Sequence, residues 1–498
     1  MRGASLIAFF PLVVLIAIPF LLRPAGERDI FENAPEKIVI ITPHTESVRN
    51  EFSRAFREYY KRKHGSDIAV EWRNVGGTSD IVRFIADRFE VQRKNGSFSP
   101  DANIGIDLFF GGGQFDHNRQ AQKGYAVDAG VQSIHPEWFK PDVIPQGFSG
   151  EIFYDKEGRY YGVCLSTFGI CWNFQRVSEM PDKSPPQKWA SLGEPRFFGK
   201  IAITDPTKSG SVNKCFEMMM QQAIAEAVAR DPINGLSQGW ADGLNLIKRI
   251  AANSRYVTDS ASKVPHDVAT GNAVAGICID FYGRSEAEWS AFQNNGKPRM
   301  AFVDPAGGTS LSADPIQLLR GAPNRKAAVE FIEFVLSFEG QKLWDFKPGT
   351  PGGPTHYALR RMPIRKDLYV EKFRQYMADP DENPYVSCAS FVYHPEWTGR
   401  YFNLLRILIK CIALEPLPEL QEAWQAIIDA GGPDKVPEAM KKFNGIPFQY
   451  KDAPMAAKSL VFDKEKNPMR SIIRTQMSWS KSCRENYREA ARLAREGK

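Results

Sequence analysis

The chain lacks the features that mark a disulfide-stabilised or zinc-binding protein. Its seven cysteines form no Cys-x-x-Cys pair, and because their number is odd, at least one cannot pair within the chain. Cys164, Cys171 and Cys278 lie in apolar runs, which favours small buried side chains over redox chemistry. We therefore expect neither a zinc site nor a disulfide framework.

Sequence motifs of common enzyme classes are also missing. The glycines at 111–113 are not followed by the Gly-Lys-Ser/Thr of a phosphate-binding loop, and no Gly-x-Ser-x-Gly, His-Glu-x-x-His or Gly-x-Gly-x-x-Gly signature occurs. An enzyme would need a nucleophile beside a base, for which Lys208, Ser209 and Ser211 are the first candidates. The sequence does not support this alternative, and we expect no catalytic residues.

Strong charge of one sign is absent too. The 498 residues include 64 basic and 58 acidic side chains, a net charge of +6, and no run of Lys or Arg suggests a surface for nucleic acid. With 43% hydrophobic and 24% charged residues, the composition is that of a folded globular protein. Its length suffices for two or three domains.

The N-terminus carries the longest apolar run. Residues 5–22 are almost entirely apolar, with Arg2 before them and Arg23 after them. This predicts a signal peptide or membrane anchor over residues 1–23, and cleavage and retention fit the pattern equally well. The polar residues 24–36 are typical of a tether. In either case we expect the rest of the chain to be periplasmic or otherwise extracytoplasmic.

Strands and helices alternate through most of the remaining chain. The β-branched runs at 37–42, 67–75 and 106–113 predict strands separated by amphipathic helices, an order typical of an α/β lobe with a largely parallel sheet. The apolar segment 160–173 suits a strand that crosses between lobes. We expect lobe 1 at 37–160 and 285–362, lobe 2 at 161–284, and a mostly helical C-terminal extension at 363–498.

Polar, glycine-containing loops follow several predicted strands. In open α/β sheets, ligands bind beyond the carboxyl ends of the strands. Ser209, Gly210 and Ser211 begin a predicted helix, where backbone N–H groups and the helix dipole favour an anion. The alternative is that these residues only form an ordinary helix cap. The predicted ligand-binding residues are His44, Thr45, Gly77, Thr78, Ser79, Gly112, Gly113, Ser209, Gly210, Ser211, Asp280 and Tyr282.

Asp280 and Tyr282 are included because the predicted strand 274–283 would point both to one face. The carboxylate would suit a cation, and the phenol a hydrogen bond or a metal. A turn cap at Asp280 and a packed Tyr282 are the equally good alternative. For His44, a capping role is as good an interpretation as a ligand contact.

Two segments resemble a known family. The block Gly271-Asn-Ala-Val-Ala-Gly276 and the later run with Asp314, Ala322-Pro-Asn324, Ala327-Ala328, Phe331, Phe334, Leu336-Ser337 and Gly340-Gln341 resemble ABC-importer solute-binding proteins. The resemblance runs from about Lys37 to about Trp344. It is to the group that includes ferric-ion, sugar-phosphate, phosphonate and polyamine binders.

The resemblance implies a two-lobed periplasmic-binding-protein-like fold of type II that captures a small anionic or zwitterionic solute for an ABC permease. The solute would be a phosphorylated or phosphonate compound, or a ferric complex; no cofactor is implied. Ferric-ion binders of this kind use two consecutive tyrosines where this chain has Phe281-Tyr282, so only His44 and Tyr282 remain as metal ligands. The alternative is a membrane-anchored sensor with the same fold.

Overall fold

The computed structural model describes residues 34–463 and 466–498. The predicted signal peptide or anchor, and the tether up to residue 33, lie outside these residues. Within the described part of the chain, no helix combines the length and the apolar character needed to span a membrane.

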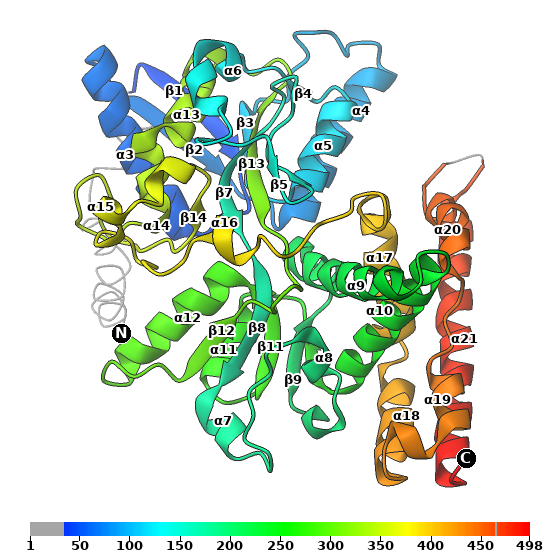
Figure 1. Ribbon diagram of the computed structural model, residues 1–498. Helices are drawn as coiled ribbons and strands as arrows, with labels where there is room; N and C mark the ends of the chain where they lie inside the picture. The colour runs from blue at the N-terminus through cyan, green and yellow to red at the C-terminus, as the bar shows by residue number, and fades with distance from the viewer. Residues whose placement is uncertain (1–33, 464–465) are drawn as a thin grey trace, which may run out of the picture.

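The first sheet forms the core of lobe 1, the upper lobe in Figure 1. Its strand order is β14-β7-β13-β3-β1-β2, with β4 paired to β13. Strand β1 runs parallel to β2 and β3, whereas β13 is antiparallel to β3 and β7. The strands are β1 (Glu36–Ile41), β2 (Ile68–Arg73), β3 (Leu108–Phe110), β4 (Ala126–Val127), β7 (Tyr161–Ser166), β13 (Ser312–Leu319) and β14 (Met362–Pro363).

Helices cover both faces of this sheet. Alternate residues of a strand point to opposite faces, and apolar residues on both faces need to be covered. Ile38 and Ile40 of β1 belong to one apolar cluster, and Val39 and Ile41 to another. The first cluster includes side chains of α3 (Glu46–His64), α13 (Arg325–Leu336) and α14 (Phe338–Asp345), and the second those of α4 (Thr78–Lys94). Ser337 separates α13 from α14, and its hydroxyl caps α14 by accepting from Gly340 N at 3.1 Å.

The second sheet forms lobe 2, below the first in Figure 1, and has the order β10-β9-β11-β8-β12. Strand β9 is parallel to β10 and β11, and β8 is antiparallel to β11 and β12. The strands are β8 (Phe168–Asn173), β9 (Ile201–Thr204), β10 (Ser254–Thr258), β11 (Ala275–Ile279) and β12 (Met300–Val303), and the main helices are α9 (Gly210–Arg230), α10 (Gly235–Ala252), α11 (Lys263–Ala269) and α12 (Asp280–Gln293).

The chain crosses between the sheets twice, from β7 to β8 at Thr167 and again between β12 and β13. The lobe boundaries expected from the sequence differ from this topology. Strand β7 falls within the predicted lobe 2 but pairs with β13 and β14 of the first sheet, and β12 falls within the predicted lobe 1 but pairs with β8. The sequence does not mark the crossing, because β7 and β8 form one continuous apolar run.

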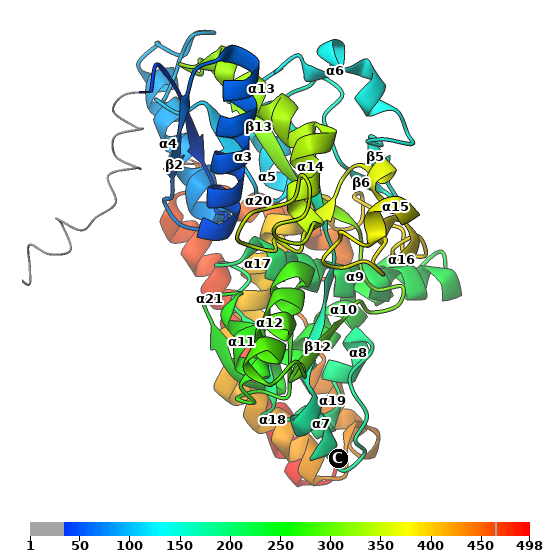
Figure 2. The ribbon, with the colours of Figure 1, turned by 90° about the vertical axis from the view of Figure 1, so that its left-hand side faces the viewer.

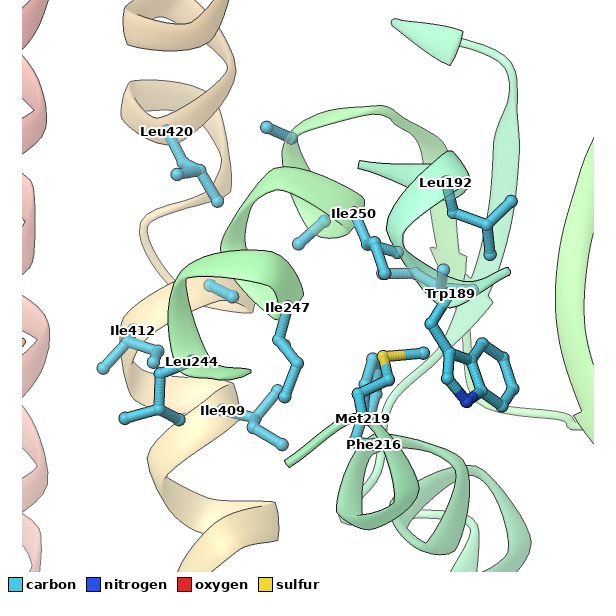
Figure 3. Packing of buried hydrophobic residues seen from close by; sticks show 14 of the residues in the cluster. Trp189, Leu192, Phe216, Met219, Leu244, Ile247, Ile250, Ile409, Ile412 and Leu420 are labelled. Carbon is cyan, nitrogen blue, oxygen red and sulfur yellow. The ribbon is translucent and has the colours of Figure 1, made fainter. Parts of the chain in front are cut away.

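The C-terminal extension is mostly helical, as expected. Its part from residue 402 onward runs along one side of lobe 2 (Figures 1 and 2), whereas residues 368–377 pack beside α14 of lobe 1. Leu244 and Ile247 of α10 lie close to Ile409 and Ile412 of the extension (Figure 3), and all four belong to one buried cluster. Apolar packing therefore joins the extension to lobe 2. Its helices are α15 (Glu371–Arg374), α16 (Pro384–Ser387), α17 (Phe402–Ile409), η5 (Lys410–Leu414), α18 (Leu417–Asp429), α19 (Pro437–Phe443), α20 (Ala453–Ser459) and α21 (Met469–Arg495).

Shorter elements connect these layers. They are α5 (Gln114–Gln122), α6 (Val131–Ile134), η1 (Pro136–Phe139), the hairpin of β5 (Gly147–Phe148) and β6 (Glu151–Ile152), α7 (Phe174–Ser178), α8 (Trp189–Leu192), η2 (Pro195–Phe197), η3 (Lys366–Leu368), η4 (Gly399–Tyr401), η6 (Pro433–Lys435) and η7 (Tyr450–Asp452). Of these, α5, the β5–β6 hairpin and η4 contribute residues to the cleft between the lobes.

Candidate functional site

A cavity of about 1030 Å³ lies between the two lobes. Residues from both sheets' strand-end loops line it, together with residues of the C-terminal extension. The lobes approach closely at one edge, where a Cβ added to Gly77 would lie 3.8 Å from the Lys208 carbonyl oxygen. All predicted site residues except Ser79 and Asp280 line the cavity: His44, Thr45, Gly77, Thr78, Gly112, Gly113, Ser209, Gly210, Ser211 and Tyr282.

Three helices begin at this cavity. Gly77 and Gly113 are the N-caps of α4 and α5 in lobe 1, and Ser209 is the N-cap of α9 in lobe 2. The first N–H groups of a helix have no partner within it, and the helix dipole adds partial positive charge there. Helix N-termini of this kind favour negatively charged groups near them.

The N-caps of these helices differ in kind. Gly77, at α4, and Gly113, at α5, provide no side-chain cap. At α9, Ser209 Oγ accepts from Val212 N at 3.2 Å and lies 3.1 Å from Ser211 Oγ. The first turns of α4 and α5 thus keep donors that no cap side chain occupies.

Glycine is required where α4 and α5 meet. Gly111 and Gly112 have φ values of 93° and 97°, which L side chains rarely adopt. A Cβ at Gly111 would lie 2.7 Å from the His44 ring, and a Cβ at Gly112 would lie 2.7 Å from Thr78 Cγ2. The two glycines therefore allow the loop after β3 to pack against the loops that follow β1 and β2.

His44 is buried and lies beside Arg361, which the sequence did not single out. Arg361 Nη1 lies 3.1 Å from His44 Nε2, and Arg361 Nη2 lies 2.7 Å from Asp314 Oδ2. The guanidinium also lies over the Phe281 ring, 4.0 Å from its centroid. Burial, and then the charge of Arg361, holds the pKa of His44 well below its ordinary value, so the ring is neutral.

Asp280 does not face the cavity with Tyr282, contrary to the expectation. Strand β11 ends at Ile279 and α12 begins at Asp280, so the two side chains follow the helical period rather than that of a strand. Asp280 is fully buried and forms an ion pair with Arg284. Tyr282 lines the cavity, and burial raises the pKa of its phenol.

Ser79 is also engaged elsewhere. Its Oγ accepts a hydrogen bond from Arg406 Nη1 of the extension at 3.2 Å. It therefore lies at the α4 terminus but outside the cavity lining.

Sequence reasoning missed a buried ionic network at the cavity wall. Lys214 of α9 lies 2.8 Å from Glu151 of the β5–β6 hairpin and 2.9 Å from Glu217. Burial alone would lower the pKa of Lys214, but the two carboxylates raise it. Glu217 also accepts from Tyr393 at 2.8 Å, which brings the extension into the network. Lys214 and Glu217 are three residues apart on α9, but Glu151 and Tyr393 lie far from them in sequence, so no local pattern reveals the network.

The chain matches known proteins over much of its length. A family model described as bacterial extracellular solute-binding protein matches residues 104–362, just over half of the chain. An uncharacterised protein of Haemophilus influenzae is 24% identical over 312 residues, 62% of this chain and 76% of that protein. The phosphoglycerate transport regulatory protein PgtC of Salmonella typhimurium is 24% identical over 184 residues, 36% of this chain and 39% of that protein.

Among solved structures, the apo ferric ion-binding protein A of Pasteurella haemolytica is similar in fold. The TM-score is 0.50 at 11% identity, over 74% of this chain and 96% of that one. At this identity the likeness shows the fold alone, and it confirms the two-lobed periplasmic-binding-protein fold. Together with the family match it establishes that this chain belongs to the bacterial extracellular solute-binding proteins, which serve as substrate-binding components of ABC importers.

Proposed function

We propose that the cleft captures a small organic anion that carries a phosphate or phosphonate group. The observation that carries this proposal is the meeting of three helix N-termini, those of α4, α5 and α9, at one cavity formed by both lobes. A tetrahedral oxyanion has enough acceptor oxygens to bind the free N–H groups of more than one helix N-terminus. Because two helices belong to lobe 1 and one to lobe 2, such an anion stabilises the closed arrangement of the lobes.

The name of one relative supports the same class of solute. PgtC of Salmonella typhimurium is described as a phosphoglycerate transport regulatory protein, although this chain covers only 39% of its length. Phosphoglycerate is a phosphate ester of a small acid, which suits a cavity of about 1030 Å³ and leaves room for a larger compound.

The cavity is poorly suited to a ferric ion held by His44 and Tyr282. Arginine has no lone pair and stays protonated, so the contact between Arg361 and His44 requires that the Nε2 lone pair of His44 accepts. Burial raises the pKa of Tyr282, which disfavours the phenolate that iron needs. Arg361 is paired with the Asp314 carboxylate, so that carboxylate is not free to bind a metal ion either.

We further propose that the protein works as a transport receptor outside the cytoplasm, delivers its solute to an ABC permease and catalyses no reaction. Ser209, the first nucleophile candidate, uses its hydroxyl to cap α9. The N-terminal apolar segment would hold the protein at the membrane if it is not cleaved. The word "regulatory" in the name of PgtC favours a second candidate, a membrane-anchored sensor of the same solute.

Two substitutions at Gly210 test the anion site. Gly210 is the first residue of α9, where proline removes an N–H group without breaking a helical hydrogen bond. The preceding residue, Ser209, has φ −132° and ψ 119°, which is compatible with a following proline. No heavy atom lies within 4 Å of a Cβ at Gly210, so Gly210→Ala is a matched control that keeps the N–H.

Isothermal titration with phosphate esters, phosphonates and inorganic phosphate supplies the measurement. We expect Gly210→Ala to bind as the wild type does, and Gly210→Pro to bind about tenfold more weakly, the loss of one charge-assisted hydrogen bond. Equal affinity in both variants would contradict a role for the α9 terminus.

A further inference from the structure

A segment of the extension passes through the region where the three helices begin. Residues 391–406, called the strap here, connect α16 to α17 and include the first residues of α17. In Figure 1 this part of the chain crosses at the level where the two lobes meet. The family model ends at residue 362, so the strap lies outside the matched region.

The strap lies along the first turns of α9. Asn213 Nδ2 donates to the Phe402 carbonyl oxygen at 2.9 Å. One helical turn further on, Glu217 Oε1 accepts from Tyr393 at 2.8 Å and from Thr398 at 2.7 Å. These side chains are buried, so the strap is fixed to lobe 2 next to the α9 terminus.

The strap also contacts lobe 1 at the other two helix termini. The ring of Phe402 lies 5.1 Å from that of Phe115, in the first turn of α5. Arg406 donates to Ser79, in the first turn of α4, at 3.2 Å. A single segment of 16 residues thus meets the beginnings of all three helices that form the anion site.

Arg400 is the cation that the strap brings to the cavity. It lines the cavity and is exposed, and its guanidinium lies 4.7 Å from the centroid of the Tyr401 ring. Within residues 34–463 and 466–498, no carboxylate lies within ion-pair distance of it. The carboxylate of Glu396, also on the strap, lies 2.9 Å from His394. The Arg400 charge therefore remains available to a bound molecule.

We propose that the strap is part of the solute site and that Arg400 binds a second anionic group of the solute. This inference rests on the proposed function, because it takes the first anionic group to be held at the helix termini. The solute is then a small compound with two anionic groups, such as a phosphate and a carboxylate. A guanidinium binds either group through paired hydrogen bonds. Phe402 and Arg406 act as positioning residues that hold the strap between the lobes.

Two ligands that differ at one carbon test this proposal. 3-Phosphoglycerate and glycerol 3-phosphate share a three-carbon skeleton and a phosphate ester, but only the first has a carboxylate. Isothermal titration of the purified full chain gives the affinity of each. We expect the wild type to bind 3-phosphoglycerate about tenfold or more tightly than glycerol 3-phosphate, since one charge-assisted interaction separates them.

Arg400→Ala should remove this preference while leaving the affinity for glycerol 3-phosphate unchanged. Arg400→Lys should restore part of it, because the charge remains but the paired geometry is lost. Arg474→Ala on the exposed face of α21, outside the cavity lining, controls for the loss of one positive charge. Arg400 is exposed, and unchanged melting temperatures will show that all three variants fold.

The possible failures are distinguishable. A wild type that binds both ligands equally well, or an Arg400→Ala variant that keeps the preference, would overturn the role of Arg400 and leave the anion site standing. A wild type that binds neither compound, nor inorganic phosphate, would overturn the proposed function together with this inference.

Discussion

Arg361 and His44, which both line the cleft, are in direct contact, with 3.1 Å between Nη1 and Nε2. Because arginine can only donate, Nε2 must accept, and the proton of the neutral ring is on Nδ1. The ring and the guanidinium come from residues 317 positions apart in sequence. The lone pair of His44 Nε2 is therefore not free to bind a metal ion.

The first prediction concerns iron. Ferric citrate added to the protein should produce no visible charge-transfer band from a tyrosinate–iron bond, because the lone pair of His44 is occupied and Tyr282 stays protonated. A visible absorption titration checks this. A band that saturates at one equivalent and disappears in Tyr282→Phe would contradict it.

The second prediction concerns the junction of α4 and α5. Gly112→Ala should lower the free energy of unfolding by about 1–3 kcal/mol, because alanine must adopt an unfavourable φ and its Cβ would contact Thr78. Binding of phosphate esters should weaken as well, since Thr78 begins α4. Denaturant unfolding and calorimetric titration give the two quantities.

Gly113→Ala serves as the matched control for this substitution. Gly113 has φ −96°, and no heavy atom lies within 4 Å of a Cβ placed there. Its effect on stability should be clearly smaller. Equal losses in the two variants would show that conformational strain at Gly112 is not the cause.

The third prediction concerns Lys214, which is paired with two buried carboxylates, Glu151 and Glu217. Lys214→Met would leave both carboxylates without their cation and should cost about 3–5 kcal/mol of unfolding free energy. Lys208→Met, at an exposed lysine on the same cleft, should change stability by no more than about 0.5 kcal/mol. Thermal and denaturant unfolding compare the two, and similar values would contradict a stabilising network.

The fourth prediction concerns the pH dependence of stability at the crossing between β12 and β13. The pKa of Asp304 is raised to about 7, mainly by burial; Asp280 and Glu382 contribute to the rise, while the Thr167 hydroxyl and Arg284 oppose it. In the unfolded chain the pKa of an aspartate side chain is about 3.9, so the group loses its proton near pH 4. Between these two pKa values the folded protein keeps a proton on Asp304 that the unfolded chain has lost. The free energy of unfolding therefore falls as pH rises through this range.

Asp304→Asn removes this titration with little change in volume. The stability advantage of the variant over the wild type should grow by on the order of 2–4 kcal/mol between pH 5 and pH 8. Denaturant unfolding at the two pH values measures the difference. A difference that does not change between pH 5 and pH 8 would contradict a raised pKa at this carboxyl group.

Local sequence patterns predicted the parts of the site that follow strands. Thr45, Gly77 and Ser209 each come shortly after a β-branched run, and parallel strands bring such loops to one edge of a sheet. Helix starts at these loops are local features as well, which explains why an anionic ligand could be proposed from the sequence alone.

The rest of the site depends on contacts between distant segments. The prediction that Asp280 faces the cavity was wrong because the run Ile-Asp-Phe-Tyr-Gly suits a strand and a helix start equally well. In the structure Asp280 begins α12 and pairs with Arg284, four residues later on the same helix. Arg361 and the strap come from regions with no motif of their own. Their position depends on β14 pairing with β7 and on the extension packing against α9 and α10.

Thermal unfolding of the purified chain with a panel of solutes tests the central claim most directly. The panel contains inorganic phosphate, sugar phosphates, phosphoglycerate, phosphonates, polyamines, thiamine and ferric citrate. A ligand at a hundred times its dissociation constant should add about 2.7 kcal/mol of stability. The account predicts that a phosphate ester or phosphonate gives the largest shift and that Gly210→Pro reduces it. A shift produced only by ferric iron or a polyamine, with none from any phosphorylated compound, would contradict the account.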